Sequence, residues 1–189
     1  MNVFFFGGTF DPPHKGHKLI YKYCMDLCDK FIFIPAAQSP GKNIPLASAE
    51  QRISMLRLLI DHRDSDKVLI DRFEIDSGIK PNYTIDTIFY LKKKFSSASI
   101  HMVVGADQYK NLSNWKDYHK IKNEVKVICF DRNLSELSNQ KHINFIDFNY
   151  NISSTEIRNK ISCGNEDKIK DYLNEEINHL IHSNGLYVN

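Results

Sequence analysis

Six short apolar runs recur along the first 150 residues. They are rich in β-branched and aromatic side chains and lie at residues 3–6, 31–35, 67–71, 100–104, 126–130 and 143–147. Each run is apolar nearly throughout, whereas a strand with one wet face would alternate apolar and polar positions. The runs therefore predict six strands that are buried on both faces of a sheet.

Segments with helical periodicity separate these runs. Two of them carry an apolar stripe, made of Leu19, Ile20, Tyr23, Leu27 and Cys28 in the first and of Ile53, Leu56, Leu59 and Ile60 in the second. Ser48 and Gln51 form a capping box that opens the second helix, and Thr84 is placed to cap a third. Strands that alternate with helices favour right-handed βαβ crossovers. The predicted fold class is α/β, with a Rossmann-like, doubly wound, mostly parallel sheet.

Strand patterns stop at about residue 150, and the tail is predicted to be helical at residues 153–161 and 166–185. Gly185 is the expected C-cap of the last helix. No repeat, low-complexity segment or clear linker interrupts the chain. We therefore expect a single domain over residues 1–189, with an α/β core over about 1–150 and a small helical C-terminal part over about 151–189.

Composition narrows the class of partner. The 189 residues are 42% hydrophobic and 25% charged, as in ordinary globular proteins, and the net charge of +2 is too small to indicate a nucleic-acid partner. No stretch resembles a signal peptide or approaches the roughly 18 apolar residues of a membrane span, so we expect a cytoplasmic protein with no membrane partner. The four cysteines lack CxxC spacing, and we interpret them as reduced, buried thiols.

The first predicted strand runs into GGTFDPPHKGH at residues 7–17. Gly7 and Gly8 are expected to let the backbone turn sharply and to let a ligand approach bare amides. A helix that starts near Gly16 would point the positive end of its dipole at a phosphate, with His14 and His17 as further donors. The spacing matches neither GxGxxG nor GxxxxGK[ST], yet it predicts a phosphate-binding loop.

A metal site is the alternative for the same stretch, because Asp11, His14 and His17 are ligand types at suggestive spacing. No convincing third histidine or acidic cluster stands beside another strand end, and His179 and His182 in the tail are expected at the surface. The residues therefore favour phosphate binding over a metallohydrolase.

Two further loops also follow predicted strands, PAAQSPGK at residues 35–42 and GADQ at residues 105–108. In open α/β sheets, ligands bind at the carboxyl ends of the strands, near the point where strand order reverses. The three loops are therefore expected to converge on one site.

These motifs carry a family resemblance. GTFDPPHKGH at residues 8–17 resembles the HxGH signature of the nucleotidyltransferase superfamily. PAAQSPGK at 35–42, YTIDT at 83–87, VVGADQ at 103–108, Trp115 and ISSTEIR at 152–158 follow in the order seen in bacterial nicotinate-nucleotide adenylyltransferases. The ordered set spans nearly the whole chain and is far more specific than HxGH alone.

The resemblance implies transfer of the adenylyl group of ATP to nicotinate mononucleotide, giving deamido-NAD and pyrophosphate in NAD biosynthesis. ATP and nicotinate mononucleotide are then the partners, and Mg²⁺ is expected to arrive with ATP. The family forms no covalent enzyme intermediate, so catalysis depends on in-line positioning and on stabilisation of charge.

The resemblance also assigns roles to residues. His14 and His17 would bind the α-phosphate, Lys42 would swing over the phosphates, and Arg158 would hold the β- or γ-phosphate in a forked contact. The other residues expected to bind ATP are Gly7, Gly8, Thr9, Phe10, Gly105, Asp107, Ser153, Ser154 and Thr155. Ser153 and Glu156 form a second capping box there.

Recognition of the acceptor is assigned to two residues. Trp115 offers a face for stacking on the pyridine ring, and free amides near Thr84 would favour the nicotinate carboxylate. Other acceptors of the superfamily, nicotinamide mononucleotide and pantetheine phosphate, are the enzymatic alternatives. A non-catalytic nucleotide-binding protein is the alternative from another class, and a homo-oligomer is compatible with the sequence.

The chain departs from the family pattern at two positions. Gly41 precedes the loop lysine, where the family often has histidine, and Asn133 stands where Arg-x-Gly is frequent. Either departure affects loop properties or affinity, and neither touches the phosphate chemistry.

Overall fold

The computed structural model describes residues 1–131, 143–148, 150 and 152–188. Its centre is one six-stranded sheet in the order β3-β2-β1-β4-β5-β6, in which every pair of neighbours is parallel. The strands are β1 (Asn2–Gly8), β2 (Lys30–Pro35), β3 (Val68–Ile70), β4 (Ser99–Gly105), β5 (Lys126–Asp131) and β6 (Ile143–Asp147). All six strands lie where they were predicted and the fold class is confirmed, but the edge strand β6 is only partly buried. The strand order reverses between β1 and β4, which places the topological switch point there.

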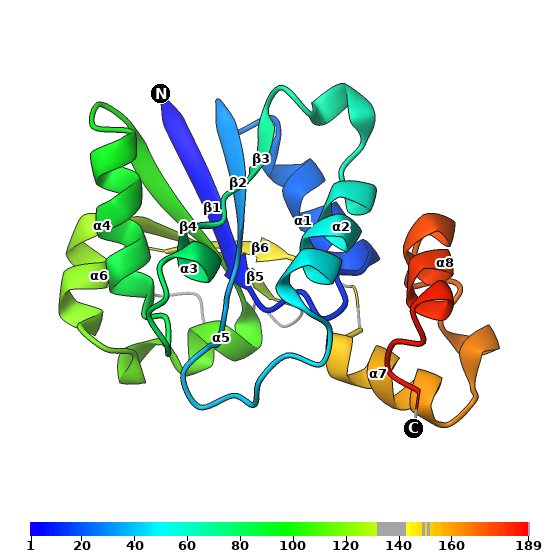
Figure 1. The fold of residues 1–189 in the computed structure, drawn as a ribbon. Helices are drawn as coiled ribbons and strands as arrows, with labels where there is room; N and C mark the ends of the chain where they lie inside the picture. Colours follow the sequence, from blue (N-terminus) through cyan, green and yellow to red (C-terminus); the bar gives the residue numbers. More distant parts are fainter. Residues whose placement is uncertain (132–142, 149, 151, 189) are drawn as a thin grey trace.

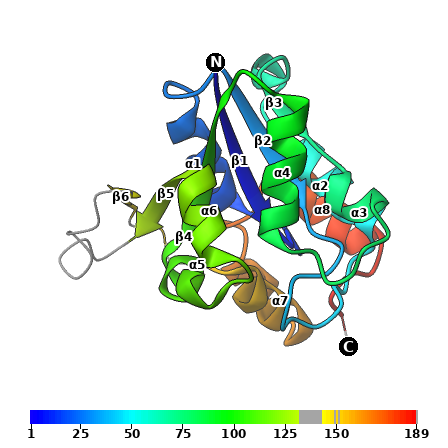
Figure 2. The same cartoon turned by 90° about the vertical axis from the view of Figure 1, so that its left-hand side faces the viewer.

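Helices cover both faces of the sheet (Figures 1 and 2). They are α1 (Lys15–Cys24), α2 (Ala49–Leu59), α3 (Phe73–Asp76), α4 (Thr84–Lys94), α5 (Ala106–Lys110), α6 (Tyr118–Glu124), α7 (Ser154–Ser162) and α8 (Glu175–Ser183), with 3₁₀ turns η1 (His62–Asp64), η2 (Leu112–Asn114) and η4 (Glu166–Lys168). Buried residues of α1, α2, α7 and α8 belong to one hydrophobic cluster, and those of α4 and α6 to another. The tail helices therefore complete one of the two outer layers.

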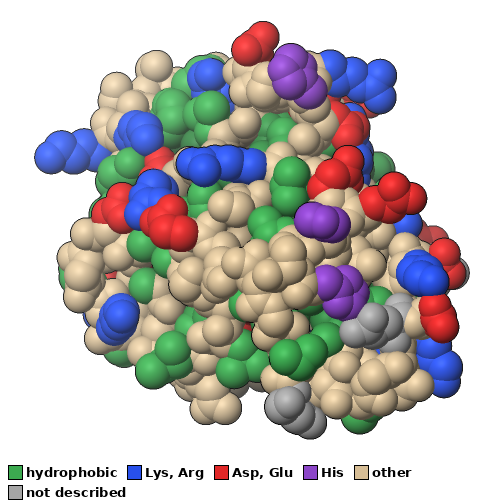
Figure 3. Space-filling view, turned by 45° about the vertical axis from the view of Figure 1, so that its right-hand side comes forward, with side chains coloured by type: hydrophobic (Ala, Val, Ile, Leu, Met, Phe, Trp, Pro, Cys, Tyr) green, Lys and Arg blue, Asp and Glu red, His purple; other side chains and the backbone are tan. Residues whose placement is uncertain are grey.

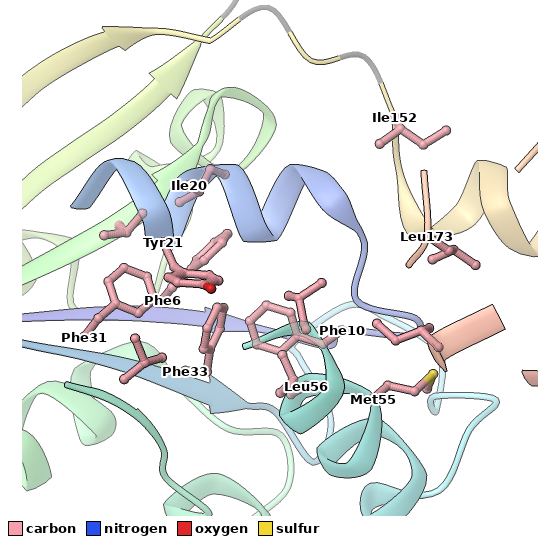
Figure 4. Packing of buried hydrophobic residues seen from close by; sticks show 14 of the residues in the cluster. Phe6, Phe10, Ile20, Tyr21, Phe31, Phe33, Met55, Leu56, Ile152 and Leu173 are labelled. Atoms are coloured by element: carbon pink, nitrogen blue, oxygen red, sulfur yellow. The ribbon is translucent and has the colours of Figure 1, made fainter. Parts of the chain in front are cut away.

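The two clusters arise from the two-residue period of the strands. Phe4 and Phe6 of β1 point into the cluster under α1 and α2, whereas Val3 and Phe5 point into the other. Figure 4 shows the first cluster, in which Phe10 lies beside Phe33 and Leu56. Because both faces of the strand are buried, the apolar run is continuous, which is the pattern that predicted it.

The helical details differ from the predictions in α1. Leu19, Tyr23 and Leu27 are 45%, 50% and 47% exposed, and the helix buries Tyr21 and Cys24 as well as Ile20. The predicted stripe was therefore wrong for three of its five members. Burial of Tyr21 is possible because its hydroxyl accepts from the Asp61 amide and donates to Asp64.

The cap of α4 and the tail also differ. The N-cap of α4 is Tyr83, so Thr84 is its first helical residue. The predicted helix over 166–185 is divided into η4 and α8, and the C-cap is Asn184. Gly185 follows it with φ +57°, the left-handed position that glycine favours after a helix. Ser48 and Gln51 form the predicted capping box.

The described surface is mixed in character. Basic and acidic side chains lie side by side on the face drawn in Figure 3. Cys24, Cys28 and Cys129 are buried free thiols as predicted, but Cys163 is exposed. In the described part of the chain, no helix has the length and apolarity needed to span a membrane.

Candidate active site

A cavity of about 1390 Å³ opens at the carboxyl ends of the strands, near α5 and α7 at the lower side of Figure 1. Its wall combines the end of β1, the loop before α1, the loop after β2 and the starts of α4, α5 and α7. Every residue predicted for the site lines it: Gly7, Gly8, Thr9, Phe10, His14, His17, Lys42, Thr84, Gly105, Asp107, Trp115, Ser153, Ser154, Thr155 and Arg158. The structure thus brings together segments that are up to 151 positions apart in sequence (7 to 158).

His14 and His17 form the centre of the loop that is predicted to bind phosphate. His14 is the N-cap of α1, and His17 is the third residue of the helix. Their ring centroids are 3.8 Å apart. The His14 backbone amide donates to Nδ1 of His17 over 3.1 Å. Since Nδ1 of His17 is an acceptor, the neutral ring carries its proton on Nε2, which makes Nε2 a hydrogen-bond donor.

Burial keeps both imidazoles neutral. It lowers the pKa of His14 from 6.5 to about 4, and it lowers the pKa of His17 well below 6.5, with a further contribution from His14. His14 is 7% exposed, and its ring lies against the first turn of α1, where its side chain faces the His17 backbone amide in a capping box. Neutral N–H donors are thus prepared for an anion.

Glycine acts differently in this loop from what the sequence suggested. Gly7 and Gly8 lie in β1 and pair with Ile34 and Pro35, so they do not form the turn. A Cβ on Gly7 would meet nothing within 4 Å, which leaves the backbone open to the cavity. The left-handed residue of the turn is Phe10, at φ 51°. Its ring packs edge-on to His17 and so supports the imidazole from behind.

Gly16, which in the sequence marks the predicted start of the helix, also lies against the His14 ring. A Cβ there would lie 3.0 Å from the His14 ring and 3.0 Å from Tyr150. Only glycine therefore lets the His14 ring lie against the first turn of α1. The signal was present in the HxGH spacing itself.

The Asp11 carboxylate is engaged by hydrogen bonds from other parts of the protein. It accepts from the amides of Leu46 and Ala47, over 2.8 and 3.1 Å, and from the Tyr187 hydroxyl over 2.7 Å. These bonds use the carboxylate oxygens inside the protein, where the residue is 3% exposed. The arrangement favours a structural role for Asp11 over the metal-ligand alternative.

The loop after β2 carries Lys42 into the cavity wall. Lys42 is exposed, and its Nζ has no hydrogen-bond or ion-pair partner within the described ranges. Gly41 before it has φ +69°. At the start of the loop, Oδ1 of Asn82 accepts from the amides of Ala37 and Gln38 over 3.0 and 3.2 Å. At its end, Asp11 holds Leu46 and Ala47.

Arg158 stands on α7 with part of its guanidinium already engaged. Nη1 donates to the Asp11 carbonyl over 2.7 Å, and Nη2 donates to Oγ1 of Thr155 over 3.2 Å. Ser153 caps α7 by accepting from the Glu156 amide, but the predicted capping box is incomplete because the Glu156 carboxylate pairs with Lys160. A phosphate would therefore meet the remaining N–H groups of Arg158 beside the N-terminus of a nine-residue helix.

The other side of the cavity holds the predicted acceptor residues. Thr84 opens α4, and Trp115 follows η2. Beside them, Nζ of Lys116 lies 4.3 Å from the centroid of the Tyr83 ring. Both Lys116 and Tyr83 line the cavity. A flat aromatic face, free helix amides and a cation are thus grouped near the start of α4.

Two buried side chains that support these loops were missed. Arg52 is 2% exposed and donates through Nη1 to the carbonyls of Thr9 and Ala36, over 2.7 and 2.8 Å. Asn82 is 8% exposed, and besides the loop amides it donates to the Glu74 and Ile79 carbonyls. Neither residue belongs to a motif. Asn133 lies outside the described residues.

Comparison with known proteins gives the family. The sequence matches the model of the cytidylyltransferase-like family over residues 5–160. A Borrelia turicatae protein named "Probable nicotinate-nucleotide adenylyltransferase" is 33% identical over 100% of this chain and 98% of its own length. One of the same name from Borreliella afzelii is 36% identical over 87% of this chain and 86% of its own.

Solved structures show the same fold at lower identity. The Plasmodium falciparum nicotinic acid mononucleotide adenylyltransferase complexed with NaAD aligns with a TM-score of 0.83 and 18% identity, covering 98% of this chain and 97% of that one. A second structure of that enzyme, complexed with APC, gives a TM-score of 0.79 over 98% and 96%. The long family match and the near full-length relatives show that the chain belongs to the cytidylyltransferase-like family and, within it, to the nicotinate-nucleotide adenylyltransferases.

Proposed function

We propose that this chain transfers the adenylyl group of ATP to nicotinate mononucleotide in the cavity at the strand ends, releasing pyrophosphate and deamido-NAD. The observation that carries the proposal is the single cavity of about 1390 Å³, whose wall joins the histidine pair, Lys42 and Arg158 to Thr84 and Trp115. Such a volume exceeds the usual range of small-ligand pockets and suits two nucleotides side by side.

The reaction needs donors and no nucleophilic side chain. An oxygen of the acceptor's phosphate forms a bond to the α-phosphorus of ATP while the bond to the bridging oxygen breaks, and pyrophosphate leaves with that oxygen. Charge therefore gathers on the equatorial and leaving oxygens, where fixed N–H groups are most effective. The Nε2–H of His17 and the ring of His14 are placed to supply them.

The cations on the two flanking segments complete the anion site. Lys42 offers three donors on a long side chain, and Arg158 offers the N–H groups not used by Asp11 and Thr155. Both reach the cavity from outside the sheet, so they suit the β- and γ-phosphates beyond the reacting centre. The positive end of α7 adds to the attraction.

Magnesium fits this site as a companion of ATP. Asp107 is an exposed carboxylate on the cavity wall, and one carboxylate together with phosphate oxygens and water suits Mg²⁺. When bound with ATP, the ion would neutralise phosphate charge. No group of three or more possible ligands lies together in the described part of the chain.

The acceptor half of the proposal depends on Trp115 and Thr84. Stacking on Trp115 holds the pyridine ring, and the amides at the start of α4 favour a carboxylate over a neutral amide. Lys116, held over Tyr83, adds a positive charge at the same end of the cavity. This grouping favours the acid mononucleotide over the amide form and over pantetheine phosphate.

The test is a substrate comparison with the full chain, Mg²⁺ and ATP. Nicotinate mononucleotide, nicotinamide mononucleotide and pantetheine phosphate are supplied in turn, and pyrophosphate and the dinucleotide product are measured. We expect clear preference for the acid mononucleotide. A preference for the amide or for pantetheine phosphate would overturn the assignment.

The acceptor subsite is tested with Trp115→Ala. We expect the KM for nicotinate mononucleotide to rise about tenfold, because stacking on an aromatic ring is worth about 1–3 kcal/mol per base. The KM for ATP should change less than twofold, and Trp115→Phe should retain most of the affinity. Equal effects on both substrates would show that Trp115 is a packing residue.

A further inference from the structure

The C-terminal segment returns to the core of the molecule. After α8, Gly185 adopts φ +57°, the Gly185 amide donates to the His182 carbonyl, and the Leu186 amide donates to the Ile181 carbonyl. These bonds reverse the chain direction, and Figure 1 shows the described segment after α8 running toward α7. Tyr187 consequently enters the hydrophobic cluster with 8% exposure.

Tyr187 is held in an unusual backbone conformation for its residue type. Its φ is +65°, in the left-handed region that bulky side chains rarely adopt. Such conformations persist where the surroundings compensate for them, and they concentrate at functional sites. Here the compensation includes the bond from the Tyr187 hydroxyl to Oδ1 of Asp11, 2.7 Å long and fully buried.

The bond satisfies the hydrogen-bonding requirement of two buried polar groups, the Tyr187 hydroxyl and the Asp11 carboxylate. A carboxylate with 3% exposure requires donors, and the Leu46 amide, the Ala47 amide and the Tyr187 hydroxyl provide three. Burial, together with Asp11, raises the pKa of Tyr187, so the phenol keeps its proton and remains a donor. Among these donors, the Tyr187 hydroxyl is the one that a single substitution removes without altering the backbone.

Asp11 connects the tail to both flanking cations. Its carboxylate fixes Leu46 and Ala47, which end the loop that carries Lys42. Its carbonyl accepts from Nη1 of Arg158 over 2.7 Å. Asp11 therefore contacts both segments, the loop through its carboxylate and Arg158 through its backbone carbonyl.

We propose that Tyr187 is a positioning residue, which acts through Asp11 to set the Lys42 loop and Arg158 for phosphate binding and transfer. The inference rests on the proposed function for its catalytic consequence, but its structural part does not. It assigns to the last residues of the chain a role in aligning the site, at a distance of 176 positions from Asp11 in sequence.

The test compares Tyr187→Phe with Tyr23→Phe, a control that removes a hydroxyl from a half-exposed tyrosine of α1. The first measurement is hydrogen exchange of the Leu46 and Ala47 amides in the full chain. We expect exchange to become at least about tenfold faster in Tyr187→Phe, because a bond to a charged acceptor is lost from their shared partner. Tyr23→Phe should leave these rates unchanged.

The second measurement compares the change in kcat with the change in the KM for nicotinate mononucleotide. In Tyr187→Phe we expect kcat to fall about tenfold, since small displacements of catalytic groups are costly. The KM for nicotinate mononucleotide should stay within about twofold, because Thr84 and Trp115 lie on other segments. Asp11→Asn, provided that it folds, should give larger changes in hydrogen exchange and in kcat. Its side-chain NH2 group is a donor and cannot accept the hydrogen bond of a backbone N–H.

Each outcome is decisive. Unchanged exchange with unchanged kcat overturns the proposal, and so does faster exchange with unchanged kcat, which would leave the tail a purely structural anchor. If the unmodified chain makes no dinucleotide from any acceptor, the proposed function fails, while the exchange rates still report on the link between tail and loop.

Discussion

The two sides of the proposed phosphate site are built in different ways. The histidine pair lies at the buried base, held by the first turn of α1, by the ring of Phe10 and by a bond between the two residues. Lys42 lies on an exposed loop whose ends are anchored by Asn82 and Asp11, and its backbone bonds within the loop to Ser39 and Gln38. The two histidines therefore have a fixed geometry, whereas the exposed Lys42 side chain is free to adjust its position to a nucleotide.

The difference has a physical cause. A donor at the reacting phosphorus must be in place before the transition state forms, and burial achieves this although it lowers the pKa of both histidines. A lysine buried in the same way would tend to lose its proton. Lys42 is exposed instead, so its side chain would have to be ordered when ATP binds.

The largest effect is expected at the base. His14→Ala should lower kcat about 10³-fold, since removal of one preorganised donor costs about 10²–10³-fold. His14→Asn, which keeps an N–H donor of similar reach, should recover part of the loss. His179→Ala on the exposed side of α8 serves as the control. Pyrophosphate release by His14→Ala at the normal rate would contradict the proposed role of the base.

The same burial predicts a pH dependence of stability. The pKa of His14 is lowered from 6.5 to about 4, so the unfolded chain takes up this proton first as the pH falls. The stabilisation is complete above about pH 6.5 and is lost progressively down to about pH 4, amounting to about 3 kcal/mol.

The measurement is the free energy of unfolding in urea at several pH values between 7.5 and 5. The matched variant His14→Gln cannot titrate and should show a smaller loss over that interval than the unmodified chain. His179→Gln should follow the unmodified chain. Identical slopes in all three would mean that His14 is not buried as a neutral imidazole.

On the loop, the expected effect is smaller and of another kind. Lys42→Ala should lower kcat about 10²-fold and leave the free energy of unfolding nearly unchanged, because its ammonium is exposed. Lys42→Arg should retain more activity, and Lys93→Ala on the exposed side of α4 is the charge-matched control. A loss of stability without a loss of activity in Lys42→Ala would contradict the view that Lys42 acts in catalysis and not in holding the fold.

Sequence patterns could establish the sheet and much of the site because both are local. Continuous apolar runs predicted the strands, and each site motif follows a strand or opens a helix. In α1, the same reasoning chose Leu19 and Tyr23, because periodicity does not show that Tyr21 satisfies its hydroxyl at Asp61 and Asp64 when buried. Two apolar faces compete there, and long-range partners decide between them.

The supports of the loops could not be read from spacing. The bond from Tyr187 to Asp11 spans 176 positions, and the contacts of Arg52 and Asn82 with loop backbone span 16 to 45. A buried polar residue is recognised by its partners, and those partners exist only after folding. In sequence, Asp11 therefore entered only the metal-site alternative, and its anchoring role is visible in the structure alone.

The smallest effect concerns the backbone just before Lys42. Gly41 has φ +69°, and a Cβ there would meet nothing within 4 Å, so conformation is the constraint and space is not. Gly41→Ala should lower kcat/KM for ATP about two- to fivefold, since an L-residue in this region costs about 1 kcal/mol. Gly41→Asn tolerates the left-handed region better and should stay closer to the unmodified value. Gly164→Ala places the same change at φ +68° outside the cavity wall, so it should affect stability alone. If Gly41→Ala and Gly41→Asn both match the kcat/KM of the unmodified chain for ATP, the positive φ of Gly41 is not needed when ATP binds. The bonds of Asn82 and Asp11 at the ends of the loop would then be sufficient to place Lys42.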